Sequence, residues 1–232
     1  MKKKTKKVDR FFILLGERLL DFFKSVGEML LLLVEAVLLC KVVFRNLDKV
    51  LPQMGKIGAD SLPIASLTAI FVGFVLALQT GVALQQFGQE EDLGAIVSIS
   101  MARELGPVLT AILVIGRIGA AITAEIATMS VSEEIDALRT LSINPVRYLV
   151  MPRFLACITM LPVLVIYVDF IGTLGGAAVA KAYFKVPFLA YFDNVADYLT
   201  FEDMAKGLVK SVVFGVIISI VSCHKGLTTT GG

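Results

Sequence analysis

Ionisable residues interrupt one of the longest apolar segments of the chain. Arg103 and Glu104 lie within residues 93–129, followed in the same segment by Arg117 and Glu125. Charged side chains at membrane depth are costly, and they usually face a cavity or a partner. The sequence therefore predicts a polar site inside a membrane protein, suited to holding a charged group.

A lysine in a later apolar segment extends this prediction. Lys210 lies about as far from the outer end of its segment as Arg103 and Glu104 lie from theirs, so the three residues can meet toward the outer leaflet. They would form either internal ion pairs that hold helices together or a polar ring around a head group. Gln79 is a further candidate for the ring, although a lone glutamine more often bonds a neighbouring helix.

The remaining polar membrane residues are harder to place. Arg103 and Arg117 share a face of an unkinked helix at about 100° per residue, whereas Glu125 is too far along the axis to pair with Arg117. Asp169 is a single carboxylate in another apolar segment, where a proton-relay role lacks an obvious partner. Small residues predict close helix packing at Gly116, Gly119, Ala120 and Ala124 on one helix and at Gly172 and Gly176 on the next.

Residues 130–141, SVSEEIDALRTL, form a short charged segment between two long apolar ones. Ser130 and Glu133 have the spacing of a capping box, which predicts a helix that begins here. Its apolar stripe of Ile135, Leu138 and Leu141 would pack either on its own protein or on a soluble partner. The residues expected to contact such a partner are Ser132, Glu133, Glu134, Ile135, Asp136, Ala137 and Leu138.

No catalytic motif accompanies these residues. The chain has no GxxxxGK[ST] nucleotide loop, no zincin motif and no nucleophile elbow. Cys40, Cys157 and Cys223 are scattered, with neither disulfide nor metal spacing, and are expected to be core residues. The chain is therefore predicted to be no enzyme and to hold no metal or cofactor, so a partner would supply any energy.

The elements that position these residues are predicted to be membrane-spanning helices. Hydrophobic residues make up 56% of the chain and charged residues 18%, with a mean hydropathy of +0.82. Residues 61–89 and 154–180 each exceed the ~20 residues that span a bilayer as a helix, and they lack the alternation of barrel strands. An all-α polytopic membrane protein is therefore expected.

The distribution of charge predicts four crossings, at residues 62–87, 95–129, 154–182 and 205–224. With the lysine-rich N-terminus in the cytoplasm, this count places the basic loops and residues 130–141 inside, and the acidic stretches 90–92 and 193–203 outside. Residues 11–26 are expected to form an interfacial amphipathic helix. Residues 29–44 are either a span or a shallow elbow, and the charge rule favours the elbow.

The apolar segment 93–129 that contains the second crossing is about 37 residues long, or ~55 Å as straight helix, so it must tilt, kink or project from the bilayer. Gly106-Pro107 supplies a kink. The chain shows no internal repeat, which gives no support to an inverted-repeat transporter. We expect residues 1–50 to form the basic N-terminus with its interfacial and elbow helices, and residues 51–232 a single transmembrane domain.

Three stretches carry a family resemblance. Residues 101–156, which include RELGP and EEIDAL, together with GLVKSVVFG at 207–215 and CHKGLTTTGG at 223–232, closely resemble the MlaE/YrbE-type permeases. These are the membrane subunits of a lipid-transporting ABC system. The resemblance covers most of the chain from about residue 50, and the family pattern continues beyond Gly232 into a further crossing that this chain is expected to lack.

The resemblance implies a homodimeric permease of the bacterial inner membrane that moves phospholipid between the inner and outer membranes. Residues 130–141 would be the coupling helix, inserted into a groove of a cytoplasmic ABC ATPase that holds ATP and Mg²⁺. A periplasmic MCE-type lipid-binding protein and a small STAS-domain subunit would complete the assembly. Arg103 and Glu104, with Lys210, would lie at the lipid pocket.

Two other functions remain open from the residues alone. An ion-gradient-driven secondary transporter would work through Asp169 or the arginine and glutamate cluster, and a membrane scaffold would transport nothing. Copurification distinguishes the permease from the secondary transporter, because the permease should copurify with an ATPase and the secondary transporter should purify alone. No nucleic acid partner is expected.

Overall fold

A computed structural model describes the backbone of residues 2–43 and 47–229, and the side chains of residues 16–39 and 48–229. Four helical stretches in this part of the chain are long and apolar enough to cross a membrane. They are Asp48–Gln85, Glu90–Val131, Val146–Tyr183 and Phe201–Leu227. The predicted all-α fold with four crossings is confirmed.

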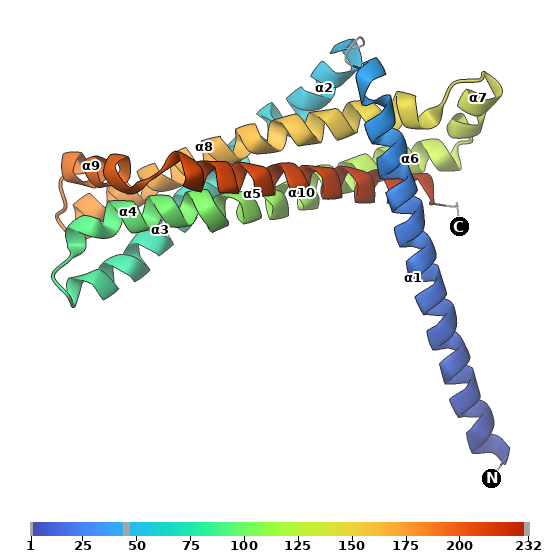
Figure 1. The fold of residues 1–232 in the computed structure, drawn as a ribbon, viewed down its shortest axis with the longest axis horizontal. Helices are drawn as coiled ribbons and strands as arrows, with labels where there is room; N and C mark the ends of the chain where they lie inside the picture. Colours follow the sequence, from blue (N-terminus) through green and yellow to red (C-terminus); the bar gives the residue numbers. More distant parts are fainter. Residues whose placement is uncertain (1, 44–46, 230–232) are drawn as a thin grey trace.

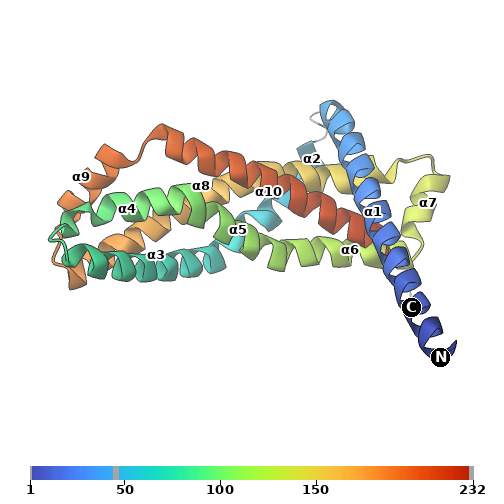
Figure 2. The ribbon, with the colours of Figure 1, turned by 60° about the horizontal axis from the view of Figure 1, so that its bottom comes forward.

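Figure 1 shows an elongated helical bundle with one helix crossing it. The short helices α7 and α9 lie at its opposite ends (Figures 1 and 2), which we call the α7 end and the α9 end. In chain order the elements are α1 (Lys2–Val43), α2 (Leu47–Ile57), η1 (Ala59–Ser61), α3 (Leu62–Gln85), η2 (Glu90–Asp92), α4 (Leu93–Ser100), η3 (Met101–Leu105), α5 (Gly106–Val114), η4 (Ile115–Gly119), α6 (Ala120–Val131), α7 (Glu134–Thr140), η5 (Val146–Val150), α8 (Met151–Tyr183), α9 (Phe188–Tyr198) and α10 (Phe201–Leu227).

Small residues hold α3 against α8. Every fourth residue of α3 is small and buried, and a Cβ atom added to Gly73 would lie 2.0 Å from the carbonyl oxygen of Gly172. The predicted packing role of Gly172 is therefore confirmed, since close helix contact needs this absence of side chain. The buried series on α3 is Ala65, Ala69, Gly73, Ala77 and Gly81.

The other predicted packing face is only partly correct. Gly119 packs on α10, where an added Cβ would lie 3.0 Å from Ser222 Oγ. Gly116 has no atom within 4 Å of such a Cβ, and Ala120 and Ala124 are exposed. Within one copy of the described chain, most of this small-residue face has no helix against it.

The second span is a helix broken by two π-helical turns, η3 and η4. The first lies directly before Gly106-Pro107, where the sequence predicts a kink, and the Gly106 N–H donates to the carbonyl of Met101, five residues earlier. Such turns concentrate at functional positions of membrane and soluble helices. Arg103 and Glu104 lie in η3, and Arg117 lies in η4.

The predicted amphipathic helix and the elbow are one continuous helix, α1, of 42 residues. It runs across the bundle near the α7 end (Figures 1 and 2), so it is not parallel to the four spans. Leu32 and Ala36 are buried against the bundle, and Glu35 accepts a hydrogen bond of 2.9 Å from Asn144. The bond from Asn144 gives the glutamate in the middle of this apolar stretch a polar partner, and the interfacial placement of α1 stays a prediction.

Several predictions about α1 fall on side chains that the structure does not describe. The N-terminal basic cluster, part of the apolar face (Phe11, Phe12 and Leu15) and Cys40 lie outside the described side chains. Within the described part, Phe22 and Phe23 are exposed on α1. Cys157 and Cys223 are buried and unpaired, as predicted for core residues.

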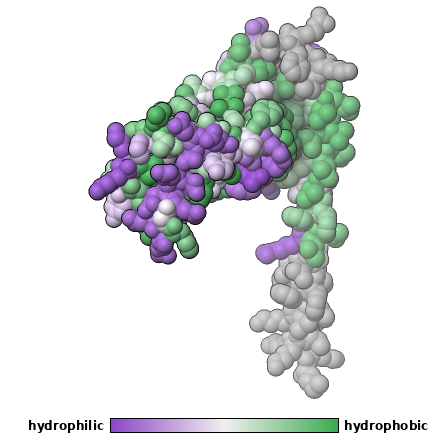
Figure 3. Space-filling model, turned by 60° about the vertical axis from the view of Figure 1, so that its left-hand side comes forward, coloured by the Kyte–Doolittle hydropathy of each residue, from purple (hydrophilic) through white to green (hydrophobic). Residues whose placement is uncertain are grey.

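At the α9 end, the prediction that the acidic stretch 193–203 is a loop is wrong. This stretch contains the end of helix α9 and the first turn of α10. A capping box explains the start of α10, because the Thr200 side chain accepts from the Asp203 N–H and the Asp203 carboxylate accepts from the Thr200 N–H. Buried Tyr191 anchors α9 on the bundle. Figure 3 looks onto this end and shows hydrophilic residues gathered there, whereas the described part of α1 is largely hydrophobic.

Candidate functional site

A charged cluster joins the first π turn of the second span to α10. Lys210 Nζ lies 2.6 Å from Glu104 Oε1 and donates a 2.8 Å hydrogen bond to the carbonyl oxygen of Arg103. Arg103 Nε lies 2.6 Å from Asp203 Oδ1. The structure thus brings together the three residues whose depths matched in the sequence, and their role in holding a head group stays a prediction.

The helix break explains why a lysine is needed here. Pro107 has no N–H, so the Arg103 carbonyl loses the donor that an α-helix would supply. Lys210 provides a replacement donor from α10. Gly207, one turn before Lys210, lets α10 approach, since an added Cβ would lie 2.0 Å from the carbonyl oxygen of Ala102. The RELGP segment (103–107) and the GLVK segment (207–210) therefore contact each other.

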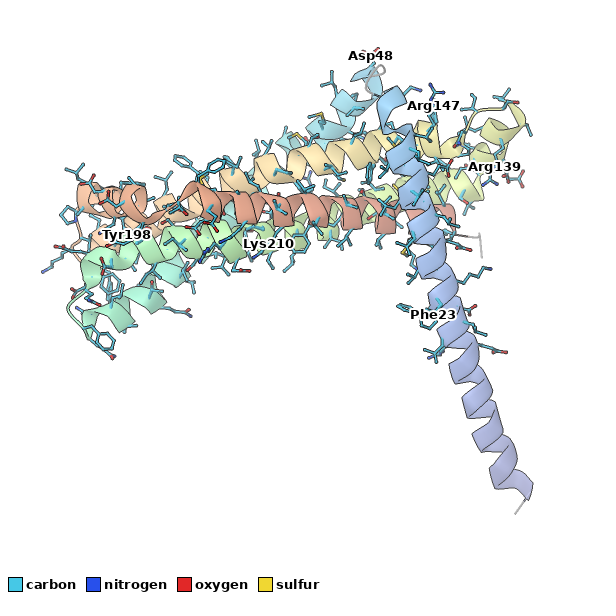
Figure 4. All side chains as sticks on the ribbon, in the orientation of Figure 1. Phe23, Asp48, Arg139, Arg147, Tyr198 and Lys210 are labelled. Atoms are coloured by element: carbon cyan, nitrogen blue, oxygen red, sulfur yellow. The ribbon has the colours of Figure 1, made fainter. Side chains whose placement is uncertain are left out.

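The cluster is balanced in charge and open on one side. The Glu202–Lys206 pair at 2.6 Å completes it, giving three cations and three carboxylates. Asp203 is nearly buried, whereas 69% of the Glu104 side chain is exposed. Glu104 and the half-exposed Arg103 are therefore the members that a ligand can reach. Figure 4 places Lys210 nearer the end that carries Tyr198 than the end that carries Arg139.

Sequence reasoning missed Asp203, which it placed in a loop outside the bilayer. The available signal was Thr200 followed three residues later by Asp203 directly before an apolar run, the pattern of a helix N-terminus. Recognising that pattern would have moved the carboxylate onto α10, in reach of Arg103.

Gln79 is not bonded to the charged cluster in the described structure, but it lines a groove next to it. The groove has a volume of about 380 Å³, lies between α3 and η3, and is mostly apolar. Leu105, which follows Glu104, forms part of its wall. An apolar groove beside charged groups suits an amphiphile. Its lining residues are Phe71, Val72, Val75, Leu76, Gln79 and Leu105.

Arg117 has a separate contact. Its guanidinium donates to the carbonyl of Asp60 and to Ser61 Oγ, the latter at 3.1 Å. Arg103 and Arg117 therefore contact different elements, α10 and η1, and the helix between them is not the unkinked one for which a shared face was expected. Each π turn adds a residue to the helical repeat, which changes the direction of the side chains that follow.

Glu125 is part of an ion triad toward the α7 end. Its carboxylate lies 2.9 Å from Lys56 Nζ and 2.8 Å from an Arg153 terminal nitrogen, and it does not pair with Arg117. Arg153 is buried and also donates to the Leu149 carbonyl at 2.8 Å. The triad links α2, α6 and α8. Both partners of Glu125 were missed, although a cation that precedes an apolar run, as Arg153 does, signals a need for a partner.

Asp169 lies on the α8 side of the same helix break. Its Oδ1 atom is buried without a hydrogen-bond partner among the described residues, and a Cβ added to Gly106 would lie 1.7 Å from it. Gly106 is therefore required for this contact. No second carboxylate of the described chain joins Asp169 in a relay, and its proton-relay role stays a prediction.

The charged segment between the second and third spans differs from its predicted boundaries. Helix α6 continues to Val131 and α7 begins at Glu134, so the predicted capping box of Ser130 and Glu133 is wrong. The Ser130 hydroxyl instead donates to the Thr229 carbonyl at 3.1 Å. Glu133 takes a left-handed conformation with φ of 61°, which ends one helix and starts the next.

The C-terminal end of α7 is also closed by a left-handed residue. Ser142 has φ of 59°, its N–H donates to the Arg139 carbonyl at 3.0 Å, and the Ile143 N–H donates to the Leu138 carbonyl at 2.9 Å. These two bonds form a Schellman motif, which usually carries glycine at the left-handed position.

The apolar stripe of α7 divides between its own protein and solvent. Ile135 is buried and Leu138 partly buried against the bundle core, whereas 70% of Leu141 is exposed. Ile135 therefore holds α7 on the bundle. The exposed predicted contact residues are Ser132, Glu133, Glu134, Asp136 and Ala137.

Four spans, a charged cluster at a helix break and a short exposed helix between two spans define a membrane transport protein of the permease class. Residues 50–232 match the family described as Permease MlaE. A probable ABC transporter permease protein of Rickettsia typhi is 42% identical over 92% of this chain and 82% of its own length. The chain belongs to the MlaE permease family.

Two further relatives support this assignment. A probable ABC transporter permease protein of Synechocystis is 42% identical over 81% of this chain and 71% of its own length. The intermembrane phospholipid transport system permease protein MlaE of Haemophilus influenzae is 34% identical over 93% of this chain and 83% of its own length.

Proposed function

We propose that this chain is the membrane subunit of an ATP-driven transporter that moves phospholipid between the inner and outer membranes of a bacterium. It resides in the inner membrane with α1 and α7 toward the cytoplasm. The observation that carries the proposal is α7, a charged, exposed helix of a permease-family chain that is fixed to the bundle by Ile135. The basic residues at the α7 end and the acidic stretches at the α9 end support this orientation.

In this proposal α7 is the coupling helix. Glu134 and Asp136 are exposed on it and face a groove of a cytoplasmic ABC ATPase, which supplies ATP and Mg²⁺. Because Ile135 and Leu138 pack into the core, movement of α7 is transmitted to α6 and α8. The complete assembly contains a second copy of this chain, a periplasmic MCE-type lipid-binding protein and a STAS-domain subunit.

Charge reversal tests the coupling role. Glu134→Lys leaves the fold intact, because the side chain is exposed, and we expect ATPase copurification and lipid transfer to fall at least tenfold. Glu91→Lys is the matched control, since Glu91 is an exposed carboxylate at the α9 end, and it should leave ATPase association unchanged. Normal association of the Glu134 variant would contradict the coupling role of α7.

The head-group site is proposed at Arg103 and Glu104, with Lys210 fixing the position of Glu104. The exposure of Glu104 and the adjacent apolar groove support it, because a phospholipid needs polar contacts beside room for acyl chains. We expect Glu104→Gln with Arg103→Gln to reduce the phospholipid that copurifies with the complex, measured by mass spectrometry. Unchanged lipid content would assign these residues to helix pairing alone.

The ATP-driven transporter and the ion-driven alternative make opposite predictions for reconstituted protein. Reconstituted vesicles should transfer lipid when ATP is supplied, and collapse of the proton and sodium gradients with ionophores should have no effect. Transfer that stops with the ionophores and continues without ATP would support the secondary transporter.

A further inference from the structure

A basic pocket lies at the α7 end, apart from the charged cluster near α10. It has a volume of about 320 Å³ and is lined by residues from α2, from the segment after α7 and from the start of α8. Figure 4 places Arg147 close to where α1 crosses the bundle, away from Lys210. The lining residues are Lys49, Ser142, Ile143, Asn144, Arg147, Tyr148 and Pro152.

The two cations of this pocket lack ion-pair partners among the described side chains. Three other cations toward this end are paired, Lys56 and Arg153 with Glu125 and Arg139 with Asp136. Lys49 Nζ instead lies 3.6 Å from the centroid of the Tyr148 ring, and both Lys49 and Arg147 are exposed. Two cations without an ion-pair partner among the described side chains therefore line this pocket.

Neither of the two nearby carboxylates forms an ion pair with Lys49 or Arg147 among the described side chains. Glu35 of α1 is engaged by the Asn144 side-chain amide at 2.9 Å, and the Asn144 oxygen accepts from the Val146 N–H at 2.8 Å. Asp48 is exposed at the start of α2 and forms no ion pair within the described part of the chain. The pocket thus offers two cations and a hydroxyl to an anion.

The depth of the pocket identifies the anion. Lys49 is the second residue of the span Asp48–Gln85, and Arg147 is the second residue of the span Val146–Tyr183. Asn144 of the pocket is also bonded to Glu35 of α1, the helix that crosses the spans and exposes apolar side chains, so with α1 at the membrane surface the pocket lies at the level of the head groups. Ile143 and Tyr148 are partly exposed beside the two cations, and apolar and aromatic residues are typical of this boundary. A soluble acidic protein would meet this surface only beyond the head groups.

We propose that this pocket binds the phosphate of an anionic phospholipid from the leaflet at the α7 end, through Lys49 and Arg147. Basic pockets between membrane helices are known to bind anionic head groups in this way. The volume lies at the lower end of the ~300–1,000 Å³ of ligand pockets, so it admits a head group while the acyl chains remain in the bilayer. The bound lipid joins α2 to the segment between α7 and α8, and the site is independent of the lipid that the transporter moves.

Native mass spectrometry of the full chain in mild detergent tests the proposal. The protein is titrated with phosphatidylglycerol, with phosphatidylcholine and with inorganic phosphate. Since each cation near an anionic surface contributes about 1 kcal/mol, Lys49→Gln with Arg147→Gln should weaken phosphatidylglycerol binding about thirtyfold. Each single variant should weaken it about fivefold, and Arg147→Lys should retain most of it.

Arg18→Gln is the matched control. Arg18 is an exposed cation on α1, more than four helical turns before Glu35, and its loss should change binding less than twofold. Because Lys49 is exposed, Lys49→Gln remains informative if the double variant fails to fold.

Four results would overturn the proposal. The first is that the double variant binds phosphatidylglycerol as well as the wild type, and the second is that the wild type binds phosphatidylcholine equally well. The third is that millimolar inorganic phosphate competes as strongly as lipid does. The fourth is that the double variant binds lipid normally but loses its association with the ATPase. The third would identify a free-anion site and the fourth a contact for an acidic protein.

Discussion

At the scale of single residues, the helix break at Pro107 is completed from another helix. The carbonyl that proline leaves without a donor is bonded by Lys210, which also holds Glu104. The depths of Arg103, Glu104 and Lys210 were predictable from residue counts along apolar segments. Their individual bonds were not, because a π turn changes side-chain directions, and because the bonds to Lys210 of α10 join residues 106 and 107 positions apart in the chain.

The triad of Lys56, Glu125 and Arg153 gives a residue-scale prediction. Glu125→Gln removes the carboxylate that pairs with the buried Arg153 guanidinium, so the protein should be destabilised by about 1–3 kcal/mol. Arg153→Met in the same chain should recover part of this loss, because the unpaired cation is then gone. Thermal unfolding of the four members of this double-mutant cycle in detergent measures the coupling.

The peripheral pair Glu202–Lys206 provides the control for that cycle. It is an exposed pair one turn apart on α10, and exposed pairs contribute little to stability. A coupling energy for Glu125 and Arg153 as small as that of this pair would contradict the structural role of the triad.

At the scale of elements, the spans follow from local composition, whereas the short helices and the helix ends depend on packing. The four spans were predictable because their length and apolar composition are local properties of the sequence. Helix α9 was missed because its acidic residues suggested a loop, whereas buried Tyr191 packs it on the bundle. The start of α7 was placed at Ser130 from a local capping pattern, but packing extends α6 through that residue.

Two glycines of the described chain differ in what surrounds them, Gly207 in a close helix contact and Gly116 on an open face. Gly207→Ala places a methyl group 2.0 Å from the Ala102 carbonyl oxygen, so α10 must move, and we expect destabilisation of at least ~1–3 kcal/mol. Gly116→Ala meets nothing within 4 Å and should preserve or raise the thermal stability of the single chain, because alanine favours helix by up to ~1 kcal/mol.

The proposed homodimer adds a second measurement to this pair. If the open face at Gly116 meets a second copy, Gly116→Ala should lower the dimer fraction on size-exclusion chromatography without lowering protomer stability. Equal stability of the Gly207 and Gly116 variants would contradict the close contact between α10 and η3.

At the scale of the whole molecule, α1 differs from the four spans in direction and in what it exposes. It crosses the bundle at the α7 end, and many of its described apolar side chains, such as Phe23 at 67% exposure, are exposed. Charge counting alone placed this region at a membrane surface. It could not show that one unbroken helix bridges the interfacial and elbow segments.

Depth-dependent fluorescence quenching tests the placement of α1. A fluorophore attached at Phe23→Cys should be quenched most strongly by lipids that carry the quencher near the head group. The control is Phe71→Cys, at an exposed position on the spanning helix α3, which should be quenched most strongly by a quencher deeper in the acyl chains. Deep quenching at position 23 would show that α1 enters the hydrocarbon core.

The two left-handed residues that flank α7 have a mechanical consequence. Glu133 and Ser142 carry positive φ angles, a conformation that costs non-glycine residues about 1–3 kcal/mol and persists only where the surroundings enforce it. In the proposed coupling, these two positions are the joints of a short rigid helix that the buried Ile135 side chain fixes to the bundle. A push by the partner on the exposed face of α7 would then reach the ends of α6 and α8 through side-chain packing and not through the backbone.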